Sequence, residues 1–135
     1  MSRIDAWKTW SLQYQLLMQV IASVNEDIAA LGVDVKELIV LAEIDEHPHP
    51  AALAEKLVMP KPTVTVYLKR LEAAHFVKRE IDAKDLRKHR LQLTPAGKKI
   101  VTRGLAILSD GFRQRLDRLS GPEQADLSRL LEKMS

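Results

Sequence analysis

Apolar residues recur every three or four positions along most of the chain, which is the spacing of amphipathic helices. This spacing holds from Ile4 to Leu31 and predicts a long first helix that Gly32 ends. Its apolar positions are Trp7, Trp10, Tyr14, Leu17, Ile21, Val24, Ile28 and Leu31. Such a long apolar seam exceeds what one small domain needs for its own core, so we expect it also to pack against a second subunit.

Capping and proline signals divide the next stretch into three shorter helices. Asp34 and Glu37 have capping-box spacing and predict a helix that ends before Pro48. Pro50 suits the first turn of the next helix, and Pro62 suits that of the third. Their predicted inner positions are Leu38, Leu41 and Ala42, then Leu53 and Leu57, then Val64, Tyr67, Leu68 and Leu71. Two short helices joined by a tight break, the second of them basic, have the plan of a helix-turn-helix.

Residues 77–93 change to a period of two, which predicts two strands. The alternating positions are Val77, Arg79 and Ile81 in the first strand and His89, Leu91 and Leu93 in the second. Residues 82–85 between them have turn chemistry. The strands and their basic tip therefore predict a hairpin, or wing, attached directly to the basic helix.

Two further helices complete the predicted order. Thr94 caps the first, which runs to about Leu119, and Ser120 with Glu123 forms a second capping box. Their apolar positions are Val101, Leu105, Leu108, Phe112, Leu116 and Leu119, then Leu127, Leu130, Leu131 and Met134. Gly104 and Gly111 share one face of the first of these helices, where they permit close helix approach or a hinge, or are merely tolerated. The pattern leaves these alternatives open.

The amino-acid composition excludes several kinds of site. The 135 residues include no cysteine, which excludes disulfides, thiolate metal sites and thiol-based redox sensing. The longest stretch without a charge, residues 9–25, is interrupted by Gln13, Gln15 and Gln19, so it predicts neither a signal peptide nor a membrane span. We therefore expect one cytoplasmic domain, mainly α-helical with a small β-hairpin wing.

The formal net charge of +3 is distributed unevenly. Residues 1–55 carry 3 basic and 9 acidic side chains, whereas residues 56–103 carry 13 basic and 4 acidic ones. Residues 104–135 carry 5 of each. A basic segment of this kind is typical of a phosphate-binding surface, although a solvated Lys-rich helix face gives the same count.

Two blocks of sequence carry a more specific pattern. Residues 85–97 read DLRKHRLQLTPAG and satisfy the wing pattern D-x-R-x-x-x-L-x-L-T-x-x-G at every fixed position, while residues 62–72 read PTVTVYLKRLE. Both blocks resemble the MarR (multiple antibiotic resistance regulator) family of winged helix-turn-helix transcription factors, the second block being similar to its recognition helix. The resemblance implies a single dimeric domain over 1–135, with a DNA-binding lobe at 33–96 and dimerisation helices at 1–31 and 97–135.

Three residues depart from the family pattern. His75 stands where the family usually has glycine after the recognition helix, and histidine tolerates a left-handed backbone less well than glycine does. Val66 replaces a common polar residue, which changes one expected DNA contact. Leu86 replaces a frequent second wing arginine and leaves Arg87 as the principal one.

The DNA contacts follow from placing the basic helix in a major groove and the wing along the adjacent minor groove. With Val64, Leu68 and Leu71 facing inward, the outward or flanking residues are available to base edges and phosphates, and each is alternatively part of a solvated helix face. Arg87 is our choice for minor-groove insertion, and Asp85 is expected to shape the wing. The complete set of expected DNA contacts is Lys61, Thr63, Thr65, Val66, Lys69, Arg70, Lys84, Arg87, Lys88 and Arg90.

The resemblance also implies a small-molecule ligand. Many members of the family respond to a small aromatic or anionic effector, and Trp7, Trp10 and Tyr14 are candidate pocket residues, although aromatics at helical spacing more often belong to a core. His47 and His49 lie in a proline-containing loop without supporting cysteines, so we expect exposed histidines, no metal site and no cofactor.

The leading hypothesis is a homodimeric, sequence-specific regulator of transcription that binds double-stranded DNA, most simply a ligand-responsive repressor on a pseudo-palindromic operator. The alternative is a winged-helix protein-interaction module without specific DNA binding, which the basic segment disfavours. An enzyme ranks far behind, because the sequence has no Ser-His-Asp set, paired catalytic carboxylates, phosphate loop or H-E-x-x-H motif.

Overall fold

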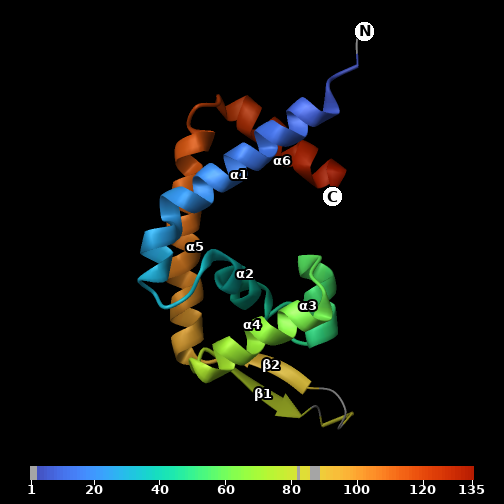
Figure 1. The fold of residues 1–135 in the computed structure, drawn as a ribbon, viewed down its shortest axis with the longest axis vertical. Coiled ribbons are helices and arrows are strands. Elements are labelled where there is room, and N and C mark those ends of the chain that lie inside the picture. The colour runs from blue at the N-terminus through green and yellow to red at the C-terminus, as the bar shows by residue number, and fades with distance from the viewer. Residues whose placement is uncertain (1–2, 82, 86–88) are drawn as a thin grey trace. The chain divides into compact units, whose positions relative to one another are not determined.

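The computed structural model describes residues 3–81, 83–85 and 89–135, and these form a mainly helical fold with one antiparallel hairpin (Figure 1). The elements are α1 (Ala6–Ala29), α2 (Val35–Glu43), α3 (Pro50–Leu57), α4 (Lys61–Ala73), β1 (Val77–Ile81), β2 (His89–Leu93), α5 (Pro95–Leu116) and α6 (Gly121–Met134). The chain divides into two compact units, residues 25–106 and residues 1–24 with 107–135, so α1 and α5 each contribute residues to both. The described residues contain no helix with the length and apolarity needed to cross a membrane.

The 25–106 unit contains the helix-turn-helix and the wing. Its α2 begins as the capping box predicts: the Glu37 N–H donates to Asp34 Oδ1 at 2.7 Å, and the Asp34 N–H donates to Glu37 Oε1 at 3.1 Å. Pro50 occupies the first turn of α3, and Pro62 that of α4. The capping and proline signals therefore place the starts of these helices correctly.

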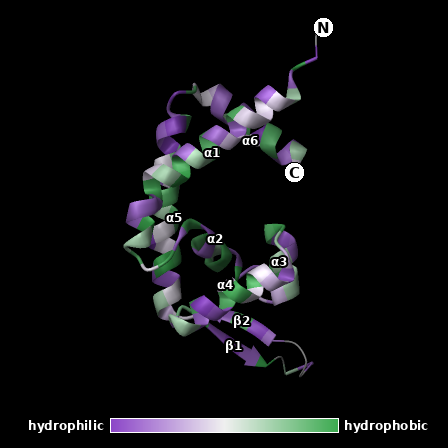
Figure 2. Ribbon diagram, viewed as in Figure 1, coloured by the Kyte–Doolittle hydropathy of each residue, from purple (hydrophilic) through white to green (hydrophobic). Residues whose placement is uncertain are grey.

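The core of this unit is apolar and comes from every one of its elements except α5. Its buried side chains are Ile28, Val33, Val35, Leu38, Val40, Leu41, Ile44, Leu53, Ala54, Val64, Leu68, Leu71, Val77, Leu91 and Leu93. They include most of the inner positions predicted for α2, α3 and α4, while both strands of the hairpin are coloured mainly as hydrophilic in Figure 2. The core thus fixes which face of α4 is left to solvent.

Two residues in left-handed backbone flank α4. Val58 ends α3 with φ 52°, and His75 follows α4 with φ 63°. His75 therefore adopts the conformation for which the family pattern has glycine. Phe76 then donates its N–H to the Leu71 carbonyl at 3.0 Å, which closes the helix end before β1 starts.

The predicted hairpin is present, with Val77 opposite Leu93 and Ile81 opposite His89. The outer edge of β2 is also bonded, because the Leu91 N–H donates to the Pro48 carbonyl at 2.6 Å. His49 Nδ1 lies 3.2 Å from the His89 carbonyl. The loop before α3 thus holds the second strand of the wing.

The glycines of α5 permit close approach. A Cβ on Gly97 would lie 2.1 Å from the Phe76 carbonyl oxygen, and one on Gly104 would lie 2.4 Å from Leu38 Cδ1. In the other unit, a Cβ on Gly111 would lie 2.4 Å from Val24 Cγ1. Of the alternatives left open for Gly104 and Gly111, the structure supports close helix approach.

The unit formed by 1–24 and 107–135 has little core of its own. The Ser120 cap of α6 is present as predicted, with the Ser120 N–H donating to Glu123 Oε1 at 2.8 Å. However, α5 and α6 are described in full, and α6 has no buried residue while α5 buries only Gly97 and Gly104. The apolar positions predicted to face inward on these helices are half-buried or exposed, so the described chain covers them only in part.

The end of α5 also differs from the prediction. The helix stops at Leu116, three residues before the predicted Leu119. The Leu119 N–H donates to the Leu116 carbonyl at 2.9 Å, so the last turn tightens to i,i+3 hydrogen bonds. The side-chain amide of Gln124 donates to the same carbonyl at 2.9 Å and completes the turn into α6.

Candidate nucleic-acid interface

The solvent face of α4 holds the residues expected to contact DNA. Val64, Leu68 and Leu71 are fully buried, which turns the rest of the helix outward. Lys61, Thr65, Val66, Lys69 and Arg70 are exposed, and Thr63 is half-buried at the first turn. The structure thus brings the six predicted α4 residues together along one exposed surface.

This surface combines hydroxyl, apolar and cationic groups. The Thr65 hydroxyl donates to the Lys61 carbonyl at 3.0 Å, which leaves its oxygen able to accept. The Arg70 guanidinium lies 5.7 Å from the centre of the Tyr67 ring, a distance typical of a cation–π contact. Tyr67 was not among the predicted site residues, and its i,i+3 spacing from Arg70 is the signal that indicates this contact.

An ion pair ties α4 to the wing. Arg79 Nε on β1 donates to Glu72 Oε1 near the end of α4, and both side chains are about one-third exposed. Neither residue was predicted to belong to the site. Their seven-residue separation crosses the corner at His75, so helical or strand spacing alone gave no reason to pair them.

Several cations of the site are left without internal partners. Among the described residues, the side chains of Lys61, Lys69 and Arg90 make no ion pair, whereas Lys78 pairs with Glu80 at 3.6 Å. An unpaired, exposed cation keeps its full charge for an external anion, so these three are suited to contact phosphate.

The wing tip is described only in part. Lys84 is exposed and Asp85 is half-buried on the segment before β2. Arg90 lies on β2, opposite Glu80 in the strand register. The predicted contacts Arg87 and Lys88, and the departure at Leu86, lie outside the described residues.

The three aromatic residues of α1 stack on one another. The Trp7 and Trp10 rings are 5.9 Å apart at 13°, and the Trp10 and Tyr14 rings are 5.4 Å apart at 11°. All three are exposed. Because they are exposed, they are not core residues of the single chain. They also do not line either of the two pockets described next.

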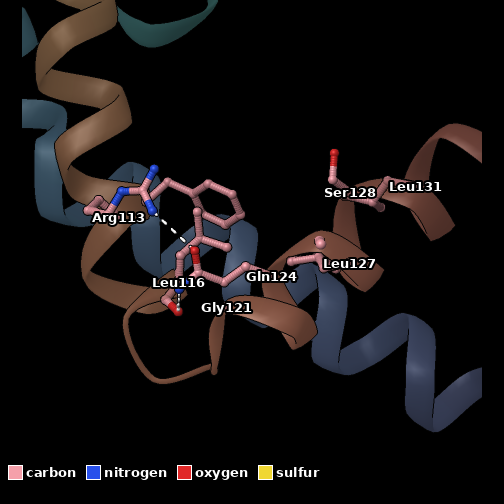
Figure 3. Close-up of a pocket in the computed structure, with 9 residues that line it drawn as sticks. Arg113, Leu116, Gly121, Gln124, Leu127, Ser128 and Leu131 are labelled. Carbon is pink, nitrogen blue, oxygen red and sulfur yellow. Dashed lines mark hydrogen bonds between the residues drawn. The ribbon is translucent and has the colours of Figure 1, made fainter.

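Those two pockets lie on the unit formed by 1–24 and 107–135. One is an apolar groove of about 600 Å³ lined mainly by residues of α1 and α5, among them Leu16, Val20 and Phe112. The other, of about 470 Å³, contains Arg113, whose Nη1 donates to Gln124 Oε1 at 3.3 Å (Figure 3). A guanidinium beside apolar walls suits a small aromatic anion.

Comparison with known proteins relates the helix-turn-helix part of the chain to one family. Residues 31–88, which contain α2, α3, α4 and β1, match the sequence profile of the MarR family.

This part of the chain is similar to the MarR family.

A curated relative shows a similarity that extends over more of the chain. Over 83 residues the chain is 37% identical to the transcriptional regulator HosA of Escherichia coli O111:H-. The match covers 62% of this chain and 62% of HosA, so it spans less than two thirds of either protein.

Solved structures of MarR-family proteins have the same winged-helix fold. A cysteine-to-serine mutant of MarR from E. coli, complexed with operator DNA, has a TM-score of 0.81 and 22% identity, and the match covers 97% of this chain and 99% of that one. The MarR-family protein Rv2887 of Mycobacterium tuberculosis, complexed with salicylic acid, has a TM-score of 0.73 and 25% identity, covering 92% and 93%. The predicted fold class, mainly α with a hairpin wing, is confirmed.

Proposed function

We propose that this chain is a sequence-specific regulator of transcription that binds double-stranded DNA as a homodimer. The observation that carries the proposal is the exposed face of α4, where hydroxyl, methyl and unpaired cationic groups lie on a helix followed directly by a wing. A helix fits the major groove, where donors, acceptors and thymine methyl groups identify the bases. The MarR–operator complex has the same fold.

Roles are assigned to the contacts by their chemistry. Thr63, Thr65 and Val66 face base edges, with Val66 suited to a thymine methyl group, because a valine side chain has no polar atom. Arg87 enters the minor groove, and Asp85 shapes the wing. The cations that contact phosphate, and so position without specifying, are Lys61, Lys69, Arg70, Lys84, Lys88 and Arg90.

The homodimer is supported by the apolar surface of the unit formed by 1–24 and 107–135. Large apolar side chains are exposed on both terminal helices: Trp7, Leu12, Leu17, Met18, Leu130, Leu131 and Met134. Exposed patches of this kind mark interfaces, and a two-fold pair of winged helices reads half-sites about one helical turn apart. We propose a pseudo-palindromic operator and repression as the mode of regulation.

The proposed effector is a small aromatic anion. Rv2887 was solved with salicylic acid, and the Arg113 pocket here offers one guanidinium beside Phe112 and Leu116. The stacked rings of Trp7, Trp10 and Tyr14 are the second candidate contact. Salicylate is expected to lower DNA affinity, because it favours the conformation that binds DNA less well. Arg113→Gln is expected to abolish that response. Arg118→Gln, a change of the same kind on the neighbouring turn, is the control and is expected to leave the response intact.

DNA binding is tested by selecting a site from a random DNA pool and measuring affinity against salt. Lys69→Ala removes two phosphate contacts per dimer, so it is expected to reduce the log–log salt slope by about 2, since each contact contributes ~0.9. Val66→Ala is expected to relax preference at one base position with little change in slope. Lys133→Ala, an exposed cation at the end of α6, is the control.

The wing is tested separately. Arg87→Ala is expected to weaken specific binding at least tenfold while the dimer stays folded, because the arginine loses the negative potential of the minor groove. An unchanged binding isotherm would remove Arg87 from the site. Weak binding with a shallow salt slope for the unaltered protein would instead favour the winged-helix interaction module.

A further inference from the structure

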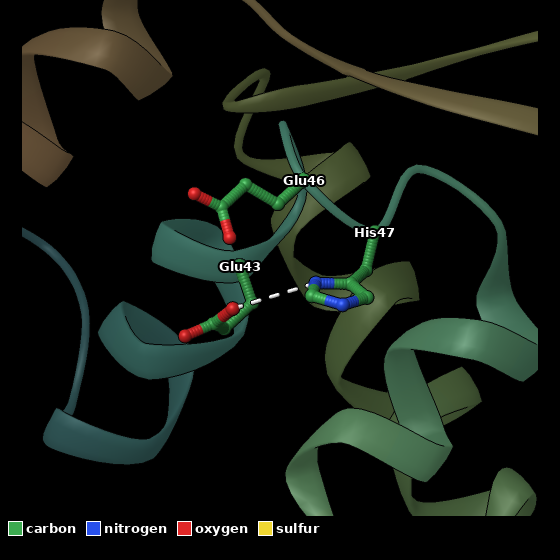
Figure 4. Close-up of side chains that lie close together, drawn as sticks. All are labelled: Glu43, Glu46 and His47. Atoms are coloured by element: carbon green, nitrogen blue, oxygen red, sulfur yellow. Dashed lines mark ion pairs between the residues drawn. The ribbon is translucent and has the colours of Figure 1, made fainter.

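Three potential metal ligands meet where α2 ends. Glu43 is the last residue of α2, and Glu46 and His47 follow in the turn after it (Figure 4). One donor atom from each side chain lies within 4.8 Å of the other two. We propose that Glu43, Glu46 and His47 bind a Zn²⁺ ion, with water completing its coordination.

The imidazole supplies the most specific part of the set. The His47 side chain is 29% exposed, but its Nδ1 atom is buried from solvent, has no hydrogen-bond partner and lies 3.5 Å from Glu43 Oε2, with which it forms an ion pair. A buried ring nitrogen without a hydrogen bond is unusual, because burial removes its bond to water. A metal ion between this nitrogen and the two carboxylates gives Nδ1 a ligand bond in place of the hydrogen bond that it lacks.

The electrostatic surroundings favour a cation. The C-terminal end of a helix carries partial negative charge, and Glu43 is at that end of α2. Asp45 adds a further carboxylate in the same turn. Among the described residues, Glu46 makes no ion pair or hydrogen bond, so its carboxylate is available to the ion.

The donor types select the class of metal. Mg²⁺ and Ca²⁺ prefer sites built from oxygen alone, and Cu(I) prefers sulfur. One imidazole and two carboxylates suit Zn²⁺, which binds nitrogen and oxygen at about 2.0–2.2 Å and often keeps one position for water. The donor atoms must draw together by an ångström or so, and rotation of the exposed Glu46 side chain permits this.

The site adjoins the loop that holds the wing. His47 immediately precedes Pro48, whose carbonyl accepts from the Leu91 N–H of β2 at 2.6 Å. An ion bound to His47 therefore restrains the residue next to that contact. An effect of Zn²⁺ on operator affinity, transmitted through β2, rests on the proposed DNA-binding function of the wing. Binding of the ion itself does not depend on that function.

The experiment is calorimetric titration of metal-free full-length protein with ZnCl2 alone. We expect one ion per chain, and Glu43→Gln, Glu46→Gln and His47→Gln are each expected to weaken binding at least about tenfold, since even outer-shell changes cost 10–100-fold. Asp45→Asn removes a carboxylate from the same turn but not from the donor set, so it is expected to retain binding within about twofold, a residual Coulombic effect. Co²⁺ absorption then reports the coordination geometry in the same four variants.

Two results would overturn the proposal. One is the absence of stoichiometric Zn²⁺ binding, which leaves a His47–Glu43 ion pair as the whole function of the cluster. The other is binding that Asp45→Asn weakens as much as the three ligand variants do, which indicates diffuse attraction to acidic groups. Circular dichroism of each variant separates loss of a ligand from loss of the fold, and the titration requires no DNA.

Discussion

Val58 is the most strained residue at the turn before α4. Its backbone is left-handed at φ 52°, although its side chain is β-branched and 91% exposed. The conformation is needed because it lets the Val58 N–H bond to the Glu55 carbonyl at 3.2 Å and the Met59 N–H bond to the Ala54 carbonyl at 3.0 Å. A left-handed backbone costs an L-residue ~1–2 kcal/mol, and glycine avoids that cost.

Val58→Gly is therefore expected to stabilise the fold. Relief of the backbone strain outweighs the extra freedom of glycine in the unfolded chain, and we expect a net gain of about 1 kcal/mol in the free energy of unfolding. Urea denaturation measures it. Val66→Gly is the matched control, since the same change inside α4 is expected to lower stability by roughly 0.5 kcal/mol. A lower free energy of unfolding for Val58→Gly would contradict the proposal that the Val58 backbone is strained.

At Gly97 the structure leaves no room for a larger side chain. A methyl group there would collide with the Phe76 carbonyl, which is backbone and belongs to the corner between α4 and β1. Gly97→Ala is expected to lower stability by about 2 kcal/mol, because overpacking exceeds the gain in helix propensity. Gly121→Ala is the control, since nothing lies within 4 Å of its added methyl group. Equal thermal stability of the two variants would show that the corner can move.

At the scale of the elements, local chemistry explains what the sequence predicted. The two capping boxes, the prolines at helix starts and the change of period at Val77 depend only on neighbouring residues, and each matches the structure. The ion pair between Glu72 and Arg79 depends on the corner at His75, which no periodicity describes. The Glu43–Glu46–His47 cluster likewise requires a helix end to bring its residues together, whereas from the sequence we considered His47 only with His49 and expected no metal site there.

The cap of α6 gives a pH-dependent prediction. The Ser120 backbone N–H donates a hydrogen bond to the Glu123 carboxylate, and this bond is the main cause that lowers the pKa of Glu123. A hydrogen bond with the Ser120 side chain lowers it further. Because the folded-state pKa is the lower one, the stabilisation is present above the unfolded-state value and is lost as the pH falls through the folded-state value. Carbon-detected NMR titration of the Glu123 carboxyl is expected to show this lowered pKa, and Glu123→Gln to remove the corresponding pH dependence of α6 fraying. An ordinary glutamate titration would contradict it.

At the scale of the whole molecule, the chain exposes more apolar surface than its own core requires. The seam predicted along α1 is buried at Val24 and Ile28 but exposed at Trp7, Trp10 and Leu17. The sequence pattern marks such positions as apolar without identifying what covers them, since the intramolecular and intermolecular partners of a helix leave the same periodicity. The inner faces predicted for α5 and α6 are therefore apolar in sequence without being buried in the single chain.

The proposed homodimer gives a prediction at this scale. Leu17 is 56% exposed, so Leu17→Glu is expected to be tolerated in the monomer but to shift the dimer toward monomer, because a dimer interface would bury the charge. Sedimentation velocity at several concentrations measures the shift. Gln19→Glu adds the same charge at an exposed polar position nearby and is expected to leave the dimer intact. A dimer unaffected by Leu17→Glu would place the interface elsewhere.

The contact between Pro48 and Leu91 has a consequence for solubility. A two-stranded hairpin has two open edges, each able to recruit a strand from another chain and begin aggregation. Along β2 the edge is occupied by a proline carbonyl, and proline has no N–H with which to extend the ladder further. The opposite edge, along β1, presents the charged residues Lys78, Arg79 and Glu80. Both edges of the wing therefore resist the addition of a strand from another molecule.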